Sequence, residues 1–387
     1  MRAVNTFKQS LISLLQPIHL IRLNAVFWAV SALLHGGRLS LTCLGRAGAG
    51  KGTPKHAIKR SDRLLGNKHL QEELPLFYRA IAHLLLKKCF RPLILIDWTR
   101  IEPTHVALVA SVPLQGRSLP IYLEVHSEKY DSNRKVMRRF LIRLQSVLPL
   151  GCKPIVVTDA GFRNHWFKAV QECGWDYVGR LRNTPDVCPV DGNEWSKLKT
   201  LYHFARATPK DIGLWIIARS NPLTSRVIAY RKRKFAKKAE PAIGSAKLKR
   251  KRKMKEPWLL ATSLKTHSAR QVVNIYRKRM QIEETFRDAK NHRFGWSFRH
   301  ARTDNAKRYE VMLLIATIAM FVSLLVGCAG EKINLHRRYQ ANTIRSRRVL
   351  SLLYLGCSLL RDGFILTVKQ RIRGIEHFQQ LAEAIDD

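Results

Sequence analysis

Two aspartates each follow a short apolar run. Asp97 ends the run "LILID", and Asp159 ends the run "IVVTD". A carboxylate is costly to bury unless it is paired or binds a cation. One such aspartate could cap a helix or lie in a turn, but two of them on strands of one predicted sheet suggest a shared cation. Hard divalent ions such as Mg²⁺ take carboxylate oxygens, water and substrate phosphate as ligands.

A third carboxylate lies in the segment "YRKRMQIEETFRDAK". On one straight helix, four side chains of this segment fall within an arc of roughly 60°: Tyr276, Arg279, Glu283 and Lys290. A phosphodiester site needs this mixture, because a carboxylate can hold a metal ion while cations and a hydroxyl contact phosphate oxygens. Glu284 points about 100° away from Glu283, so Glu283 is the better candidate. The alternative is a solvated helix face with i,i+4 ion pairs.

A glycine-rich stretch, "LGRAGAGKGTPKHA" at residues 44–57, has the composition of a phosphate-binding loop. Such a loop requires a strand before it and a helix that begins near its lysine. "RLSLTCL" could be the strand, but a helix from Lys51 would place Pro54 inside it, where the missing N–H breaks the hydrogen-bond ladder. A helix that starts at Thr53 avoids this problem. We therefore expect the glycines to form a flexible linker, and we expect no nucleotide cofactor.

The charge of the chain is its strongest compositional signal. Its 387 residues include 69 Lys and Arg against 28 Asp and Glu, a formal net charge of +41. A polyanionic partner relieves that self-repulsion, and nucleic acid is the leading candidate because bound phosphates release counterions. An anionic membrane surface is the alternative. The length allows two or three domains with a sizeable core, and 46% hydrophobic residues argue against global disorder.

Three further features bear on the compartment. The seven cysteines form no C-x-x-C pair, which is typical of reduced thiols in a cytosolic protein. The start of the chain lacks the pattern of a signal peptide. Residues 311–330 carry no charge, and their length is that of a membrane span. A helix buried in the centre of a domain has the same composition, and we favour that interpretation.

The order of the predicted elements indicates the fold class. Residues 1–88 have apolar residues at helical spacing, and Gly66 closes a helix that starts at Thr53. After them the sequence predicts a strand at "RPLILIDWTRI", a hairpin around "PLQGRS", a helix, the strand "KPIVVTDA", a helix and the strand "DYVGRL". A mixed sheet covered by helices accommodates that order.

The second half of the chain is more basic. "GLWIIARS" and "SRVIAYRKRK" predict strands, and residues 231–255 then hold 13 Lys or Arg and one Glu. That run is either a solvated loop or an arm that contacts phosphates. One long helix is expected from Ser268 to about His292, followed by the buried-helix candidate and a basic helical tail.

The helical segment fits Y-x2-R-x3-E-x6-K and resembles the signature of the DDE transposases of bacterial insertion sequences, in the IS-four family. "IDWTRI" around Asp97 and "VTDAGFRNHWF" around Asp159 resemble the other two blocks of that family, in the same order. The resemblance extends over most of the chain. It implies an α/β fold, with an RNase H-like mixed-sheet core that a β-rich insertion interrupts. It also implies that Asp97, Asp159 and Glu283 are catalytic and hold two Mg²⁺ ions, for which Mn²⁺ can substitute.

The same resemblance implies a reaction. The enzyme would bind the inverted repeats of its element, cleave the ends through a hairpin and join their 3′-hydroxyls to target DNA. Tyr276, Arg279 and Lys290 would bind phosphates near the cleaved ends, and Trp258 would stack on a flipped base. The protein would act as a homodimer on paired ends in the bacterial cytoplasm, with the nucleoid and not in a membrane.

Five parts of the chain follow from this resemblance. They are a helical N-terminal domain for transposon-end DNA (1–88), the first part of the catalytic core (89–182), a basic β-rich insertion (183–256), the second part of the core with the Glu-bearing helix (257–330) and a helical C-terminal region with dimer contacts (331–387). Two other classes stay open: a nucleotide-hydrolysing enzyme, and a DNA- or membrane-binding protein without catalysis. Both leave the Tyr276 stripe unexplained.

Overall fold

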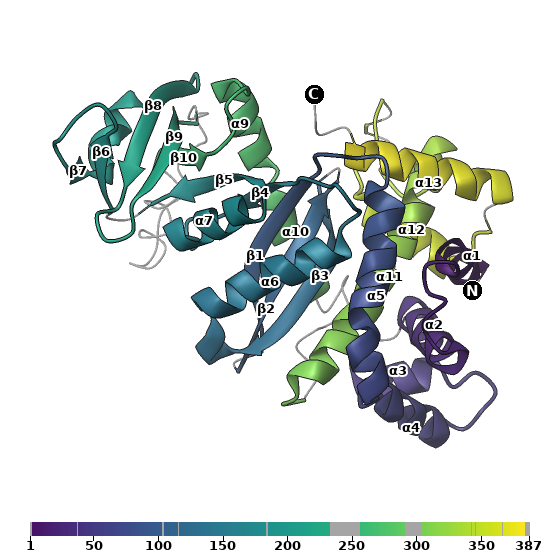
Figure 1. The fold of residues 1–387 in the computed structure, drawn as a ribbon. Helices are drawn as coiled ribbons and strands as arrows, with labels where there is room; N and C mark the ends of the chain where they lie inside the picture. Colours follow the sequence, from purple (N-terminus) through teal and green to yellow (C-terminus); the bar gives the residue numbers. More distant parts are fainter. Residues whose placement is uncertain are drawn as a thin grey trace, which may run out of the picture. The chain divides into compact units, whose positions relative to one another are not determined.

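The computed structural model divides the chain into two units (Figure 1). Unit 1 comprises residues 1–153 and 280–387, and unit 2 comprises residues 154–279. The structure describes residues 2–383, except for residues 37, 103, 115, 183–184, 233–255, 291–302, 342, 345 and 366.

Unit 1 contains three antiparallel strands in the order β3–β2–β1. Their bounds are β1 (Leu93–Glu102), β2 (His105–Pro113) and β3 (Ser118–Ser127). The middle strand β2 is buried along its whole length, which explains why its sequence "HVALVASVP" is almost entirely apolar. The predicted strand and hairpin are confirmed.

Helices make up the rest of unit 1. They are α1 (Arg2–Leu11), α2 (Leu20–Leu34), α3 (Leu41–Ala47), α4 (Pro54–Leu65), α5 (Lys68–Leu86), α6 (Arg134–Val147), α10 (Met280–Lys290), α11 (Ala306–Lys332), α12 (Leu352–Arg361) and α13 (Val368–Glu383), with 3₁₀ turns at Glu128–Tyr130 and Leu335–Arg338. The core forms where α11 packs against β3 and against α2, α5, α12 and α13.

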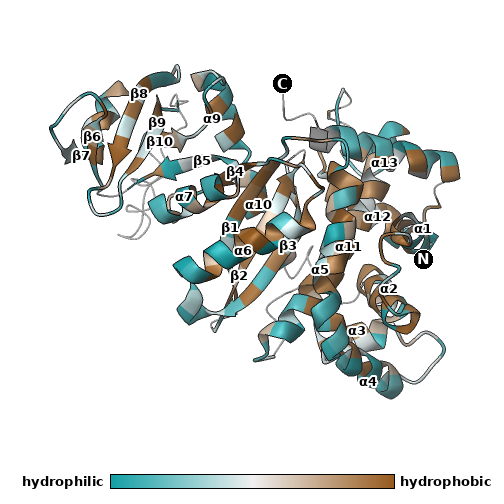
Figure 2. Ribbon diagram, viewed as in Figure 1, coloured by the Kyte–Doolittle hydropathy of each residue, from teal (hydrophilic) through white to brown (hydrophobic). Residues whose placement is uncertain are grey.

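The apolar segment 311–330 lies inside α11. Among the described residues, α11 is the one helix long and apolar enough to cross a membrane, and 89% of its most apolar window is buried in the protein. Figure 2 shows hydrophobic residues on α11 and α12, whereas α4 is mostly hydrophilic. Burial on all sides explains the uniform composition of α11, as expected for the central helix of a core.

The glycine-rich stretch is not the expected linker at its first two glycines. The segment "RLSLTCL" contributes to helix α3 rather than to a strand, and α4 then begins at Pro54 with Thr53 as N-cap, as predicted. A Cβ on Gly45 would lie 2.5 Å from Ile58 of α4, and one on Gly48 would lie 2.5 Å from the Trp28 ring of α2. These glycines therefore allow three helices to pack closely, which is a role in the core of the helical region.

Unit 2 contains a mixed sheet in the order β4–β5–β10–β9–β8–β6–β7. β4 and β5 are parallel, and the other neighbouring pairs are antiparallel. The strands are β4 (Ile155–Thr158), β5 (Asp176–Leu181), β6 (Asp186–Pro189), β7 (Ser196–Lys197), β8 (Lys210–Ile217), β9 (Leu223–Tyr230) and β10 (Trp258–Thr262). The helices are α7 (Asn164–Glu172), the 3₁₀ segment Leu198–Phe204 and α9 (Ala269–Arg277). Most of the predicted basic arm, residues 233–255, lies outside the described residues.

The prediction of one helix from Ser268 to His292 is wrong. A capping box at Ser268 starts α9, but α9 ends at Arg277 and α10 begins at Met280. The N–H groups of Lys278 and Arg279 donate to carbonyls three residues back, at 3.1 Å each. Such bonds tighten the chain into a 3₁₀ turn, so the straight-helix geometry assumed for residues 276–290 does not apply.

Candidate active site

Asp97 lies on β1 of unit 1, directly after four buried residues. Its Oδ1 accepts a hydrogen bond from the N–H of Trp98 at 2.9 Å, and its side chain is half-buried. Because side chains alternate along a strand, Asp97 and Thr99 lie on the same face of β1. A metal ion bound by Asp97 would therefore lie on this face of β1.

Helix α10 reaches this face of β1. Nζ of Lys290 donates to Oγ1 of Thr99 at 2.7 Å. Glu283 is exposed in the first turn of α10, and it lies seven residues before Lys290, so the two residues share one side of the helix. Two of the predicted carboxylates thus lie on elements of unit 1 that are in contact.

Glu284, which the sequence pattern set aside, has a different role. Its carboxylate pairs with Arg287 of the same helix and lies 3.9 Å from Nη1 of Arg117. It is thus part of an ion-pair cluster, and Glu283 stays the better candidate for a metal ligand.

Asp159 lies in unit 2, directly after β4. Its Oδ1 accepts a hydrogen bond from the N–H of Gly161 at 2.8 Å. A Cβ at Gly161 would lie 3.1 Å from the same oxygen, so glycine leaves room for the carboxylate in this tight turn. As at Asp97, a backbone N–H orients one carboxylate oxygen.

The three carboxylates have the donor chemistry that a hard divalent cation requires. Among the residues that the structure describes, no three His, Cys, Asp or Glu side chains form a group that could hold a metal ion. Asp97 and Glu283 belong to unit 1 and Asp159 to unit 2, and the convergence of all three stays a prediction.

Residues 88–321 match the sequence family described as the transposase DDE domain. The match covers more than half of the chain and includes Asp97, Asp159 and Glu283. This chain belongs to that family. DDE transposases are enzymes of DNA transposition and generally use divalent metal ions. Because they bind DNA, a net charge of +41 suits this family. No curated protein sequence matches the chain.

Tyr276 of the transposase is buried in unit 2, at 4% exposure. Burial raises the pKa of its phenol, and the nearby charge of Arg279 only partly offsets that effect. Tyr276 therefore keeps its proton and can donate a hydrogen bond. The guanidinium of Arg279 lies 5.9 Å from the centre of the Tyr276 ring.

Trp258 lies at the start of β10 and is half-buried between two tyrosines. Its ring centre is 4.9 Å from that of Tyr276, edge to face, and 5.6 Å from that of Tyr230. Arg277 donates to the Tyr230 hydroxyl at 2.7 Å. Trp258 thus belongs to an aromatic cluster with cations at its border, a composition that suits packing and base stacking alike.

Arg180 of β5 is a residue that the sequence analysis missed. Its Nε is buried and has no hydrogen-bond partner within the described part of the chain. Burial lowers the pKa of its guanidinium, while the phenol of Tyr276 acts in the opposite direction. A buried guanidinium with an open donor suits a phosphate or carboxylate. The signal in the sequence was a lone cation inside the apolar strand "DYVGRL".

Proposed function

We propose that this transposase belongs to the IS-four group and carries out cut-and-paste transposition. It binds the inverted repeats of its element, cleaves phosphodiester bonds at the ends through a hairpin, and joins the 3′-hydroxyls to target DNA. The observation that carries the proposal is the family match over residues 88–321, because that range includes the three proposed carboxylates. In this proposal strands β1 to β5 belong to an RNase H-like core. Strands β6 to β9 and residues 231–255 belong to the segment inserted into that core.

Asp97, Asp159 and Glu283 would hold the metal ions. When bound, two Mg²⁺ ions, or Mn²⁺ in their place, would activate the attacking water or 3′-hydroxyl and stabilise the leaving oxygen. The Trp98 and Gly161 N–H groups would orient the two aspartates, because each already donates to one carboxylate oxygen.

Four side chains would bind the DNA phosphates next to the cleaved bond: Tyr276, Arg279, Lys290 and Arg180. Charge-assisted hydrogen bonds from guanidinium groups to phosphate oxygens are strong and directional. Trp258 would stack on the base that is extruded during hairpin formation. Its neighbours Tyr230 and Tyr276 support this role, because their rings pack against the indole and fix its position.

The helical N-terminal region, residues 1–88, would recognise the ends of the element. Helix α4 supports this assignment because its exposed side carries five basic or histidine side chains: Lys55, His56, Lys59, Arg60 and Arg63. Arg60 also lies over the ring of Trp28 of α2, at 4.3 Å from its centre, so this contact links α4 to α2. Cations on one face of a helix bind the DNA backbone.

The remaining parts of the chain would support the same reaction. The basic insertion, residues 183–256, would contact the DNA backbone. Residues 331–387 would contribute to a homodimer on paired ends, in the cytoplasm and with the nucleoid. The catalytic core would comprise residues 89–182 and 257–330.

The test is cleavage of a duplex that carries an end of the element, with Mg²⁺ and without ATP. We expect Asp97→Asn and Glu283→Gln each to reduce the rate of cleavage more than about 100-fold. Loss of a residue that only supports a metal ligand typically costs about 10–100-fold, and loss of a ligand itself should cost more. Binding of the same duplex in a gel-shift assay should persist. Asp131→Asn, which changes an exposed aspartate of unit 1, is the matched control and should cleave normally.

Three results would contradict this function. Cleavage that requires ATP, or that Lys51→Ala abolishes, would favour a nucleotide-hydrolysing enzyme. Full cleavage activity of Asp97→Asn would show that Asp97 is not a metal ligand. Solubility only in detergent would favour a membrane protein.

A further inference from the structure

The β2–β3 hairpin contacts α10 through residues that lie along one side of the helix. Leu114 donates its N–H to Oε1 of Gln281 at 2.8 Å, and Ser118 donates its N–H to Oγ1 of Thr285 at 2.8 Å. The Thr285 hydroxyl in turn donates to the Ser118 carbonyl at 3.0 Å. These contacts come from residues four apart, which face the same way on a helix.

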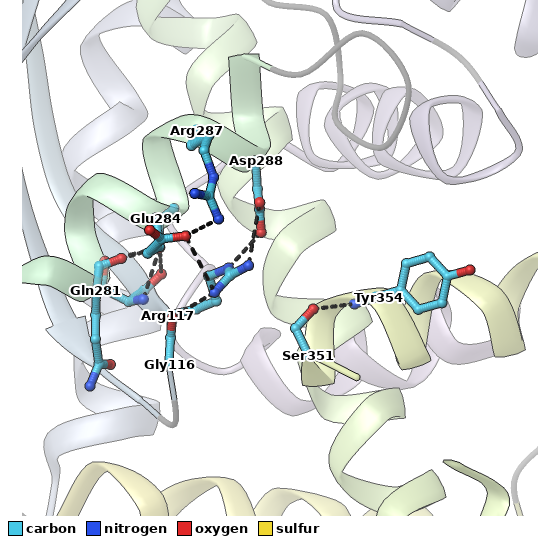
Figure 3. Close-up of polar contacts among 10 residues, drawn as sticks. Gly116, Arg117, Gln281, Glu284, Arg287, Asp288, Ser351 and Tyr354 are labelled. Atoms are coloured by element: carbon cyan, nitrogen blue, oxygen red, sulfur yellow. Dashed lines mark hydrogen bonds and ion pairs between the residues drawn. The ribbon is translucent and has the colours of Figure 1, made fainter. Parts of the chain in front are cut away.

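Arg117, at the tip of the hairpin, adds the charged part of this contact. Its Nε lies 2.6 Å from Oδ2 of Asp288, and its Nη1 lies 3.9 Å from Glu284 (Figure 3). Nη1 also donates to the carbonyl of Gly116 at 2.8 Å, so the guanidinium is tied to its own hairpin. The Arg117 side chain is only 20% exposed, and ion pairs shielded from water are screened less than surface pairs.

Packing alone holds α10 weakly. The helix has 11 residues, a length at which an isolated helix is marginal in water. Of these, Ile282 and Thr285 are buried. Phe286 and Ala289 border an apolar cavity of about 50 Å³ between α10, α11 and the strands, so the apolar contact is not tightly filled. The rotation of α10 about its own axis therefore depends on its polar contacts, which include those with the hairpin and the bond from Lys290 to Thr99.

We propose that Arg117 is a positioning residue for the metal ligand Glu283. Arg117 binds Glu284 and Asp288, which lie one and five residues after Glu283 on α10, and thereby fixes the direction in which the Glu283 carboxylate points. This inference rests on the proposed function of Glu283. Metal ligands must be held within about 0.5 Å of their working positions, which one flexible helix cannot achieve without such support.

The experiment compares Arg117→Ala, Arg117→Lys and the exchanged pair Arg117→Asp with Asp288→Arg in the full-length protein. Binding of Mn²⁺ is measured by calorimetry, and kcat and KM for duplex cleavage are measured separately. We expect Arg117→Ala to weaken Mn²⁺ binding about 10–100-fold and to lower kcat with KM for DNA unchanged. Arg117→Lys and the exchanged pair should recover part of both, because each restores an ion pair between the hairpin and α10.

Arg143→Ala is the matched control. It removes another arginine–carboxylate pair of unit 1, with Glu124 of β3, at 3.1 Å. It should lower the melting temperature without changing Mn²⁺ binding. If Arg117→Ala does not fold, Asp288→Asn gives the same test from the other partner.

The outcomes separate this inference from the proposed function. Normal Mn²⁺ binding and normal kcat in Arg117→Ala or Asp288→Asn, in a protein that Glu283→Gln inactivates, would overturn the positioning role alone. Equal effects of Arg117→Ala and Arg143→Ala would also overturn it, since both would then act only through stability. A wild-type protein that neither binds Mn²⁺ nor cleaves DNA would instead overturn the proposed function.

Discussion

Helices α10 and α11 follow one another in the chain of unit 1, yet they are held in different ways. α11 has 27 residues, is buried nearly all round and packs against several other helices, chiefly α12, α13 and α2, and against β3. α10 has 11 residues and is held by a hairpin through hydrogen bonds and ion pairs. Apolar burial is non-directional, whereas hydrogen bonds and ion pairs fix an orientation. The helix that carries the proposed metal ligand is the one that depends on directional contacts.

Close backbone packing supplements burial at α11. A Cβ on Gly356 of α12 would collide with the carbonyl oxygen of Ser323 of α11, and one on Gly327 would collide with the carbonyl of Leu352. Backbone atoms cannot move aside as a flexible side chain can. The pair α11–α12 therefore depends on two glycines for its separation.

The largest effect on stability is expected at this contact. Gly356→Ala should lower the free energy of unfolding by about 3 kcal/mol or more, at the upper end of overpacking costs, because the clash is with backbone. Urea denaturation measures this change. Gly66→Ala is the control, because a Cβ there meets its nearest atoms at 3.4 Å and should alter stability little. Equal stability of Gly356→Ala and wild type would show that α12 is not bound closely to α11.

A middle-sized effect is expected from α10. Thr285→Val keeps the shape of a buried side chain but leaves the Ser118 N–H without its acceptor, at a cost of about 1–3 kcal/mol. Ser323→Ala in α11 should cost below about 1 kcal/mol, since that hydroxyl donates to Ala319 of its own helix. Thermal denaturation of both variants tests the contrast. If Ser323→Ala lost more stability than Thr285→Val, the comparison of the two helices would be wrong.

The smallest effect on stability is expected at the contact between α6 and β3, where Arg143 of α6 pairs with Glu124 of β3. Burial by itself would raise the pKa of Glu124, but the close contact with His126, the hydrogen bond from Tyr122 and the charge of Arg143 outweigh it and lower the pKa below the ordinary value of 4.5. A carboxyl with a lowered folded-state pKa adds stability above its ordinary pKa, and that stability is lost as the pH falls through the folded-state value.

Acidification therefore tests Glu124. Wild-type protein should lose more stability than Glu124→Gln when urea midpoints are compared at pH 7 and below pH 4.5, where the ordinary carboxyl binds its proton. Glu128→Gln is the control, because Glu128 is 44% exposed in its pair with Arg100. Parallel pH profiles for wild type and Glu124→Gln would exclude Glu124 as a source of acid sensitivity.

Much of the fold could be predicted from local pattern. The apolar runs before Asp97 and Asp159 form β1 and β4, and the helix expected between the hairpin and "KPIVVTDA" is α6. The uncharged segment 311–330 forms a buried helix. These predictions hold because strand and helix periodicity is a property of neighbouring residues.

One error came from contacts between separate helices, and the other from a local change in hydrogen bonding along the chain. Gly45 and Gly48 have the composition of a linker, but Ile58 and Trp28 approach them closely. The 3₁₀ turn at Lys278 and Arg279 interrupts a segment with continuous helical periodicity. At Gly45 and Gly48, tertiary packing overrode a local preference of at most about 1 kcal/mol per residue.

The sequence by itself determined which residue types stand at the ends of the strands, that α11 is hydrophobic all round, and that the chain carries a charge suited to DNA. Only the tertiary structure decided that Arg117 of a hairpin meets Glu284 and Asp288 of α10, more than 160 positions later in the chain. It also decided that Arg180 lies near enough to Tyr276 for the phenol to affect the pKa of the guanidinium. The reason is physical: hydrophobic pattern acts over one or two turns of chain, whereas a polar contact requires two atoms at about 3 Å, which depends on the path of all the residues between them.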